Sequence, residues 1–252
     1  MIYKMKYMGS KSRFAKAIYA KICELSPRNG RAWVEPFAGG MNMICEVPHE
    51  DGPRYANDCN KYLIAMFKEL ANGWIPPQTV TREFYEKCRN FDEEAHVVGY
   101  VGFNCSYSGK WFGGYAGEVT LKDAVYNGKF EKGRTRNYQI EAFHSIFKQI
   151  AKLNEVWYCN ASYNEIAIPE NSVVYCDPPY EGTTKYKDDF NHAEFWNWVR
   201  QVSKEHDVFV SEYNAPEDFE CVWQSVATSS LSANGKSGGN KQSVEKLFRL
   251  IK

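Results

Sequence analysis

The segment Val173-Val174-Tyr175-Cys176-Asp177-Pro178-Pro179-Tyr180 carries the clearest structural signal in the chain. Its first four residues are apolar, with two β-branched and one aromatic side chain, which is typical of a buried strand. The two prolines cannot continue a hydrogen-bonded ladder, and they fix φ at two successive positions. An acid and a phenol ring are therefore held just beyond the carboxyl end of a strand, which is the edge where open α/β sheets bind ligands.

This segment suits the binding of an exocyclic amine on a nucleobase. Such an amine is a poor nucleophile because its lone pair is delocalised into the ring. The Asp177 carboxylate, with an ordinary pKa of about 3.9, and the Pro178 carbonyl could each accept one of its hydrogens and hold the nitrogen in a more tetrahedral state. Tyr180 would stack on the base, which must first leave its duplex. The alternative is a structural Pro-Pro turn in which Asp177 caps a helix, and the four residues alone do not decide between the two.

A second strand and turn lie near the start of the chain. Residues 32–35 form an expected strand, and Pro36-Phe37-Ala38-Gly39-Gly40-Met41-Asn42 follows as a turn, with a helix expected through Ile44. Glycine allows a ligand to approach the backbone closely. The segment lacks the GxGxxG fingerprint and the lysine of a phosphate-binding loop, so it suits a ligand with an adenosine and no phosphates. Taken alone, the turn is better explained as a tight strand-to-helix connection.

Two further elements strengthen the interpretation of this turn as a nucleoside site. Residues 54–58 read as a strand that ends in Asp58, roughly twenty residues after the glycines, where an acid can accept both ribose hydroxyls. Tyr7 and Lys11 flank a small turn at Gly9, and a flat ring and a cation so placed suit an adenine and a carboxylate. The second observation is weak by itself.

Residues 72–136 differ in character from the rest of the chain. Residues 102–115 are dense in glycine and aromatic residues and match neither a helical nor a strand pattern, as expected of a functional loop. Interleaved aromatic, amide and lysine side chains suit insertion into DNA, and a basic run at 129–136 suits phosphate binding. A glycine-rich connector with buried aromatic residues is the alternative. We predict an inserted target-recognition domain at 72–136, and a catalytic domain made of residues 1–71 and 137–252.

The remaining segments alternate between helical and strand patterns, which predicts an α/β sheet. We expect helices at 60–70, 139–152 and 193–202, strands at 155–159 and 208–210, and an edge strand at 245–251. We expect residues 181–191 to form a mobile loop over the site. Residues 232–243 read as a cationic loop that could contact phosphates.

Composition limits the function classes. The formal net charge is +0, so nucleic-acid binding must depend on local patches. The 8 cysteines and 5 histidines lack metal-ligand spacing and predict reduced thiols and no metal site. Neither a membrane span nor a signal peptide is evident, so we expect a cytoplasmic protein of a prokaryotic or phage-infected cell.

Together, the motifs resemble those of the Dam-type (D12 class) DNA adenine-N6 methyltransferases, in particular phage-like members. The resemblance rests on Lys6-Tyr7-Met8-Gly9-Ser10-Lys11, Glu35-Pro36-Phe37-Ala38-Gly39-Gly40, Asn57-Asp58 and Asp177-Pro178-Pro179-Tyr180, and on their order along nearly the whole chain. One departure is Met41, which stands where the family often has a second glycine.

The resemblance implies a Rossmann-like S-adenosylmethionine-dependent methyltransferase sheet with a reversed C-terminal hairpin and an inserted, mainly helical DNA-recognition domain. It implies double-stranded DNA as substrate, S-adenosylmethionine as cofactor, GATC as the expected motif, and a monomer or weak dimer on DNA. The implied catalytic residues are Asp177, Pro178, Pro179 and Tyr180, and the implied cofactor residues are Tyr7, Lys11, Phe37, Gly39, Asp58 and Asp177. The expected DNA contacts are Asn104, Ser106, Tyr107, Lys110, Trp111, Lys129, Lys132, Arg134, Arg136, Lys236 and Lys241.

Other activities stay open on the sequence. Cytosine-N4 methylation is chemically close, but its usual motif begins with Ser instead of Asp. An RNA adenine methyltransferase is a further enzyme alternative, and a catalytically inactive DNA-binding homologue is the non-enzyme one. The sequence does not distinguish a solitary enzyme from a phage enzyme or a restriction-modification component.

Overall fold

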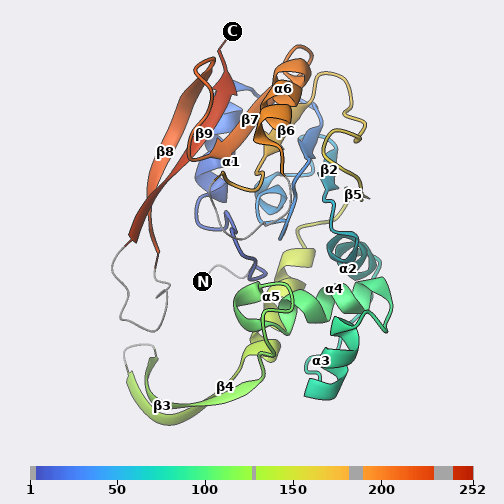
Figure 1. The fold of residues 1–252 in the computed structure, drawn as a ribbon, viewed down its shortest axis with the longest axis vertical. Helices are drawn as coiled ribbons and strands as arrows, with labels where there is room; N and C mark the ends of the chain where they lie inside the picture. Colours follow the sequence, from blue (N-terminus) through green and yellow to red (C-terminus); the bar gives the residue numbers. More distant parts are fainter. Residues whose placement is uncertain (1–3, 127–128, 182–189, 230–240, 252) are drawn as a thin grey trace.

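The computed structural model describes residues 4–126, 129–181, 190–229 and 241–251, and it is built on a seven-stranded sheet (Figure 1). The strand order is β5-β2-β1-β6-β7-β9-β8. The strands are β1 (Trp33–Glu35), β2 (Arg54–Asn57), β5 (Val156–Cys159), β6 (Val173–Cys176), β7 (Asp207–Glu212), β8 (Phe219–Ser229) and β9 (Lys241–Leu250). The first five strands in this order pair in parallel, and β9 and β8 are antiparallel. The predicted α/β class and reversed C-terminal hairpin are confirmed.

Helices cover both faces of the sheet because the buried strands are apolar on both sides. Trp33, Tyr175 and Phe209 share one core with α1 (Ala15–Leu25). Their sequence neighbours Val34 and Val174 point to the opposite face, into a second core with α6 (His192–Val202). Side-chain alternation along each strand thus fills two cores, and the polar residues that follow the strands gather at the carboxyl edge.

The segment between β2 and β5 departs from the sheet and forms a separate helical layer with a long hairpin (Figure 1). Its helices are α2 (Lys61–Ala71), α3 (Arg82–Arg89), α4 (Ala95–Asn104), the short η2 (Tyr107–Gly109) and α5 (Tyr138–Ile150). Strands β3 (Glu118–Tyr126) and β4 (Lys129–Asn137) pair only with each other and extend away from the body. The helix α4 packs closely on α2, since a Cβ at Gly99 would lie 2.0 Å from the Tyr62 carbonyl oxygen.

Three local expectations need correction. The segment at 245–251 is not an edge strand, because β9 lies between β7 and β8. The helix expected after the glycine turn is only the 3-10 turn η1 (Ile44–Glu46). Residues 102–104 are the last turn of α4 and not irregular loop.

Candidate active site

The Asp177-Pro178-Pro179-Tyr180 turn begins where β6 ends, as predicted, and Lys11 reaches it from the N-terminal segment. The Lys11 Nζ lies 2.9 Å from Asp177 Oδ1 and 3.6 Å from Glu245 Oε1, and the lysine is only 7% exposed. Nearly complete burial would disfavour a charged amine, but the two carboxylates outweigh it and the pKa of Lys11 is raised. The cation is therefore a fixed part of the site.

Tyr180 is oriented by three neighbours. Its hydroxyl donates a hydrogen bond to Glu245 Oε1. Lys11 Nζ lies 4.5 Å from the centre of its ring, and the Tyr213 ring packs edge-on at a centroid distance of 4.7 Å. The ring that is expected to stack on a base is thus held from its hydroxyl end and along its sides.

Buried acids concentrate around this turn. Burial raises the pKa of Asp177 to about 6 against the opposing effect of Lys11, so its carboxylate is still the main form at neutral pH. Burial also raises the pKa of Glu35, at the end of β1, to about 8 and that of Glu212, at the end of β7, to about 7. Glu35 accepts a hydrogen bond from Trp33 Nε1 at 2.8 Å, which opposes the rise in its pKa.

The glycine turn after β1 is tied to the acid that ends the neighbouring strand. Gly39 has a left-handed φ of 48°, and its N–H donates to Asp58 Oδ2 at 3.0 Å. Asp58 Oδ1 accepts from the Asn60 N–H at 2.9 Å. Burial raises the pKa of Asp58, while these two backbone donors oppose the rise. Asp58 therefore shapes the turn through these two backbone hydrogen bonds.

Asn57 holds the same edge together. Its Nδ2 donates to the Pro36 carbonyl at 2.9 Å and to the Ala161 carbonyl at 3.0 Å. Its Oδ1 accepts from the Ala161 N–H at 3.0 Å. One buried amide thus joins the ends of β1, β2 and β5.

The residues around the glycines fit an adenosine-type ligand. Tyr7 lies against both glycines, and a Cβ at Gly40 would lie 2.6 Å from Tyr7 Cβ. Asn42 is 3% exposed, and neither its amide nitrogen nor its amide oxygen has a hydrogen-bond partner within the described chain. Met41 has a φ of 55°, so this non-glycine residue adopts the backbone conformation that glycine favours. A ring, a tight backbone turn and a buried polar amide meet here.

The backbone of Phe37 belongs to this turn, but its side chain packs away from the glycines. Its ring stacks on Tyr163 at 5.2 Å and contacts Phe190 and Phe195 edge-on, in the core with α6. Packing accounts for both Phe37 and Tyr163. A cofactor contact of Phe37 stays a prediction.

The predicted DNA contacts at the end of α4 fall in two groups. Asn104 and Ser106 are buried, whereas Tyr107 and Lys110 are exposed. Trp111 packs between Tyr62, Phe103 and Phe112. Tyr107, which is 64% exposed, and Lys110 are thus the two of the five that a duplex could reach directly.

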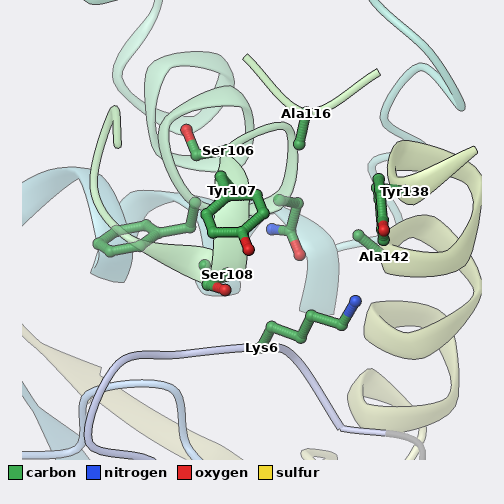
Figure 2. Close-up of a pocket in the computed structure, with 10 residues that line it drawn as sticks. Lys6, Ser106, Tyr107, Ser108, Ala116, Tyr138 and Ala142 are labelled. Atoms are coloured by element: carbon green, nitrogen blue, oxygen red, sulfur yellow. The ribbon is translucent and has the colours of Figure 1, made fainter. Parts of the chain in front are cut away.

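Figure 2 shows a polar pocket beside this loop, between the N-terminal segment, the end of α4 and the start of α5. Its volume is about 170 Å3, and Lys6, Ser106, Ser108 and Tyr138 line it together with Asn104. Asn104 Nδ2 contacts Met66 Sδ at 3.4 Å, and its Oδ1 is buried without a partner among the described residues. The pocket is therefore suited to a polar group.

The basic residues of the long hairpins are described only in part. Arg136 forms a two-bond ion pair with Glu141, at 2.6 Å for both nitrogens. Lys129, Lys132 and Arg134 lie on β4 and Lys241 begins β9, but their side chains are outside the described set. Lys236, like most of the expected mobile loop at 181–191 and the expected cationic loop at 232–243, lies outside the described residues.

Sequence reasoning missed Glu212, Glu245, Glu35 and Asn42 as site residues. Glu212 directly follows the apolar strand pattern at 208–210, so the reasoning that found Asp58 could have found it too. Glu245 carried no such signal, because its position depends on the order of strands. In the part of the chain that the structure describes, no group of three or more metal-ligating side chains occurs, and no helix is long and apolar enough to cross a membrane.

The comparisons with known proteins find methyltransferases. The family model described as D12 class N6 adenine-specific DNA methyltransferase matches residues 7–103. The type II methyltransferase M.CviBI of Paramecium bursaria Chlorella virus NC1A is 22% identical over 214 residues, which cover 80% of this chain and 75% of that protein.

The similar solved structures are distant. The rRNA methyltransferase aviRa of Streptomyces viridochromogenes has 9% identity and a TM-score of 0.42, over 96% of this chain and 84% of that one. The putative methyltransferase SMU.472, complexed with SAH, has 11% identity and a TM-score of 0.37, over 95% of this chain and 52% of that one.

A mainly parallel sheet has a glycine turn and an Asp-Pro-Pro-Tyr turn at one carboxyl edge, and together with the family match it indicates an S-adenosylmethionine-dependent methyltransferase. Within that class, the chain is similar to the D12 class of N6 adenine-specific DNA methyltransferases, whose family model matches residues 7–103.

Proposed function

We propose that the enzyme methylates N6 of an adenine that has left its duplex, within a short motif for which GATC is the expected sequence. The observation that carries the proposal is the partly buried Asp177 carboxylate, held 2.9 Å from Lys11 and followed, after two prolines, by the Tyr180 ring. A flat heterocycle with an exocyclic amine matches this pair, and only an extrahelical base could reach it.

The roles of the catalytic turn follow from its chemistry. Asp177, ionised above about pH 6, accepts one N6 hydrogen, and the Pro178 carbonyl accepts the other. Pro178 and Pro179 keep both acceptors in place, and Tyr180 stacks on the ring. S-adenosylmethionine supplies a methyl carbon activated by its sulfonium. The N6–carbon bond forms as the carbon–sulfur bond breaks, and N6 loses one proton, for which Asp177 is the nearest base.

The cofactor residues are proposed from the same edge. Tyr7 and Gly39 would bound the adenosine, and Asp58 would accept ribose hydroxyls with the lone pairs that its backbone donors leave. Lys11 would face the amino-acid carboxylate while remaining paired with Glu245. Phe37 would affect cofactor binding indirectly, because its packed ring anchors the backbone of the glycine turn.

The DNA is proposed to lie along the inserted segment, residues 72–136, which we propose as the target-recognition domain. The η2 turn that follows α4 presents Tyr107 and Lys110, and the β3–β4 hairpin carries the basic residues Lys129, Lys132, Arg134 and Arg136. Asn104, Ser106 and Trp111 would shape this surface from within, and Lys236 and Lys241 stay proposed phosphate contacts.

The test is single-molecule sequencing of DNA from cells that express the wild type or Asp177→Ala. We expect N6-methyladenine in one short motif in the first sample and none in the second. Methylation of a motif other than GATC would refute the expected specificity alone. Absence of methyladenine with a folded, cofactor-binding protein would refute the proposal and favour cytosine N4 or RNA.

Base flipping needs a separate measurement. A duplex with 2-aminopurine at the target position should gain fluorescence on binding the wild type, because the base leaves the stack. The same probe at a neighbouring position should not respond. Equal signals at both positions would contradict flipping of the target base.

A further inference from the structure

The C-terminal hairpin contributes a carboxylate to the catalytic turn. Glu245 lies on β9, is 8% exposed, and accepts the Tyr180 hydroxyl hydrogen on Oε1. The same oxygen lies 3.6 Å from Lys11 Nζ. Glu245 therefore contacts both residues that flank Asp177, although it follows them by many positions in the chain.

A second carboxylate from the same side of the sheet holds the backbone that follows. Glu212, at the end of β7, accepts the N–H of Glu181 at 3.2 Å and that of Tyr213 at 2.7 Å. Tyr213 in turn packs against Tyr180. The segment after the two prolines is thus fixed at its backbone by Glu212 and at its aromatic hydroxyl by Glu245.

The charge balance explains why an acid is needed on β9. Lys11 is buried between Asp177 and Glu245. If Asp177 were its only carboxylate partner, the cation would neutralise the charge of Asp177 more strongly than it does when Glu245 is also present. A second carboxylate shares the cation, so Asp177 keeps acceptor capacity for a substrate amine. Replacing Glu245 would leave Lys11 paired with Asp177 alone.

We propose that Glu245 is a positioning residue of the methylation reaction, which fixes the Tyr180 ring through its hydroxyl and shares Lys11 so that Asp177 can accept the adenine amine. This inference rests on the function proposed above. Glu245 does not touch the reacting atoms and acts through Tyr180 and Lys11.

The groups that surround Asp177 set the expected change in its titration. Lys11 faces it from the N-terminal segment, Tyr180 from its own turn and Glu245 from β9, while Glu35 on β1, Glu212 on β7 and Tyr175 on β6 lie within electrostatic reach. Glu245 raises the pKa of Asp177. Glu245→Gln removes that repulsion and leaves Lys11 undivided, so the pKa of Asp177 should fall.

The first experiment titrates Asp177 directly in the intact protein. Protein labelled with 13C at aspartate carboxyls gives a signal for Asp177 that Asp177→Asn identifies by its loss. We expect Glu245→Gln to move this titration to lower pH. The control Glu220→Gln should leave it unchanged, because Glu220 lies on the neighbouring strand β8, is exposed and pairs with Arg249. An unchanged titration in Glu245→Gln overturns the inference, whether or not the wild type methylates DNA.

The second experiment is a double-mutant cycle in single-turnover methylation. Glu245→Ala and Tyr180→Phe should each slow the step, Glu245→Ala by about tenfold, and the double variant should be little slower than the worse single variant. Multiplicative losses would overturn the role through Tyr180. An inactive wild type would instead refute the proposed function, while the carboxyl titration still decides the role of Glu245.

Discussion

At most buried positions an alanine variant is more stable to unfolding than a glycine variant. At Met41 we expect the opposite order. It is fully buried and has a left-handed φ of 55°. Met43 is 3% exposed and has a helical φ of −82°, which makes it a matched control two residues away. The two positions lose the same side chain when replaced but differ in backbone conformation.

The magnitudes follow from two contributions. Truncating a buried methionine to alanine costs about 2–5 kcal/mol of unfolding free energy at either position. A left-handed backbone costs an L-residue about 1–2 kcal/mol, which glycine avoids. Met41→Gly should therefore be as stable as Met41→Ala or up to about 1 kcal/mol more stable. Met43→Gly should be about 1 kcal/mol less stable than Met43→Ala, because glycine loses more backbone entropy on folding.

Urea unfolding followed by far-ultraviolet circular dichroism measures these differences, with the unfolding slope checked for constancy across the four variants. The reasoning fails if the glycine variant has a lower unfolding free energy than the alanine variant by the same amount at both positions. Met41 would then carry no backbone strain. A related protein with glycine in place of Met41 would therefore lose the side-chain packing but would also avoid the free-energy cost of the left-handed backbone.

Three further predictions address the site itself. The single-turnover methylation rate should fall about tenfold per pH unit below the Asp177 pKa of about 6, because the hydrogen-bond acceptor is the carboxylate. A rate that stays flat down to pH about 5 would contradict this assignment. Asn57→Ala should lower the unfolding free energy by about 2–4 kcal/mol in the same urea assay, since three buried hydrogen bonds are lost. The control Asn160→Ala, at an exposed residue with one hydrogen bond, should lower it by under about 1 kcal/mol. Gly40→Ala should weaken S-adenosylmethionine binding about tenfold or more in calorimetry, because its Cβ would displace Tyr7, and an unchanged affinity would separate Tyr7 from the cofactor site.

The sequence predicted those parts of the fold in which an apolar run ends in a polar residue. Strands β1, β2 and β6 have this form, and Asp58 and Asp177 lie at the edge where parallel strands place them. The β3–β4 hairpin gave no such signal. Among the described residues its two strands pair only with each other, and charged residues take the place of an apolar run in β4.

The role of Glu245 lay beyond sequence reasoning for a topological reason. A parallel strand brings its last residue to the ligand-binding edge, whereas an antiparallel strand brings its first half there. β9 runs against β7, with Lys246 opposite Glu212, so the start of β9 reaches the Asp-Pro-Pro-Tyr turn. The two prolines fix the backbone of that turn, but they leave the side-chain torsions of Tyr180 free to rotate. A carboxylate on an antiparallel strand of the same sheet removes that freedom, which gives the reversed hairpin a role in the chemistry of the site in addition to closing the sheet.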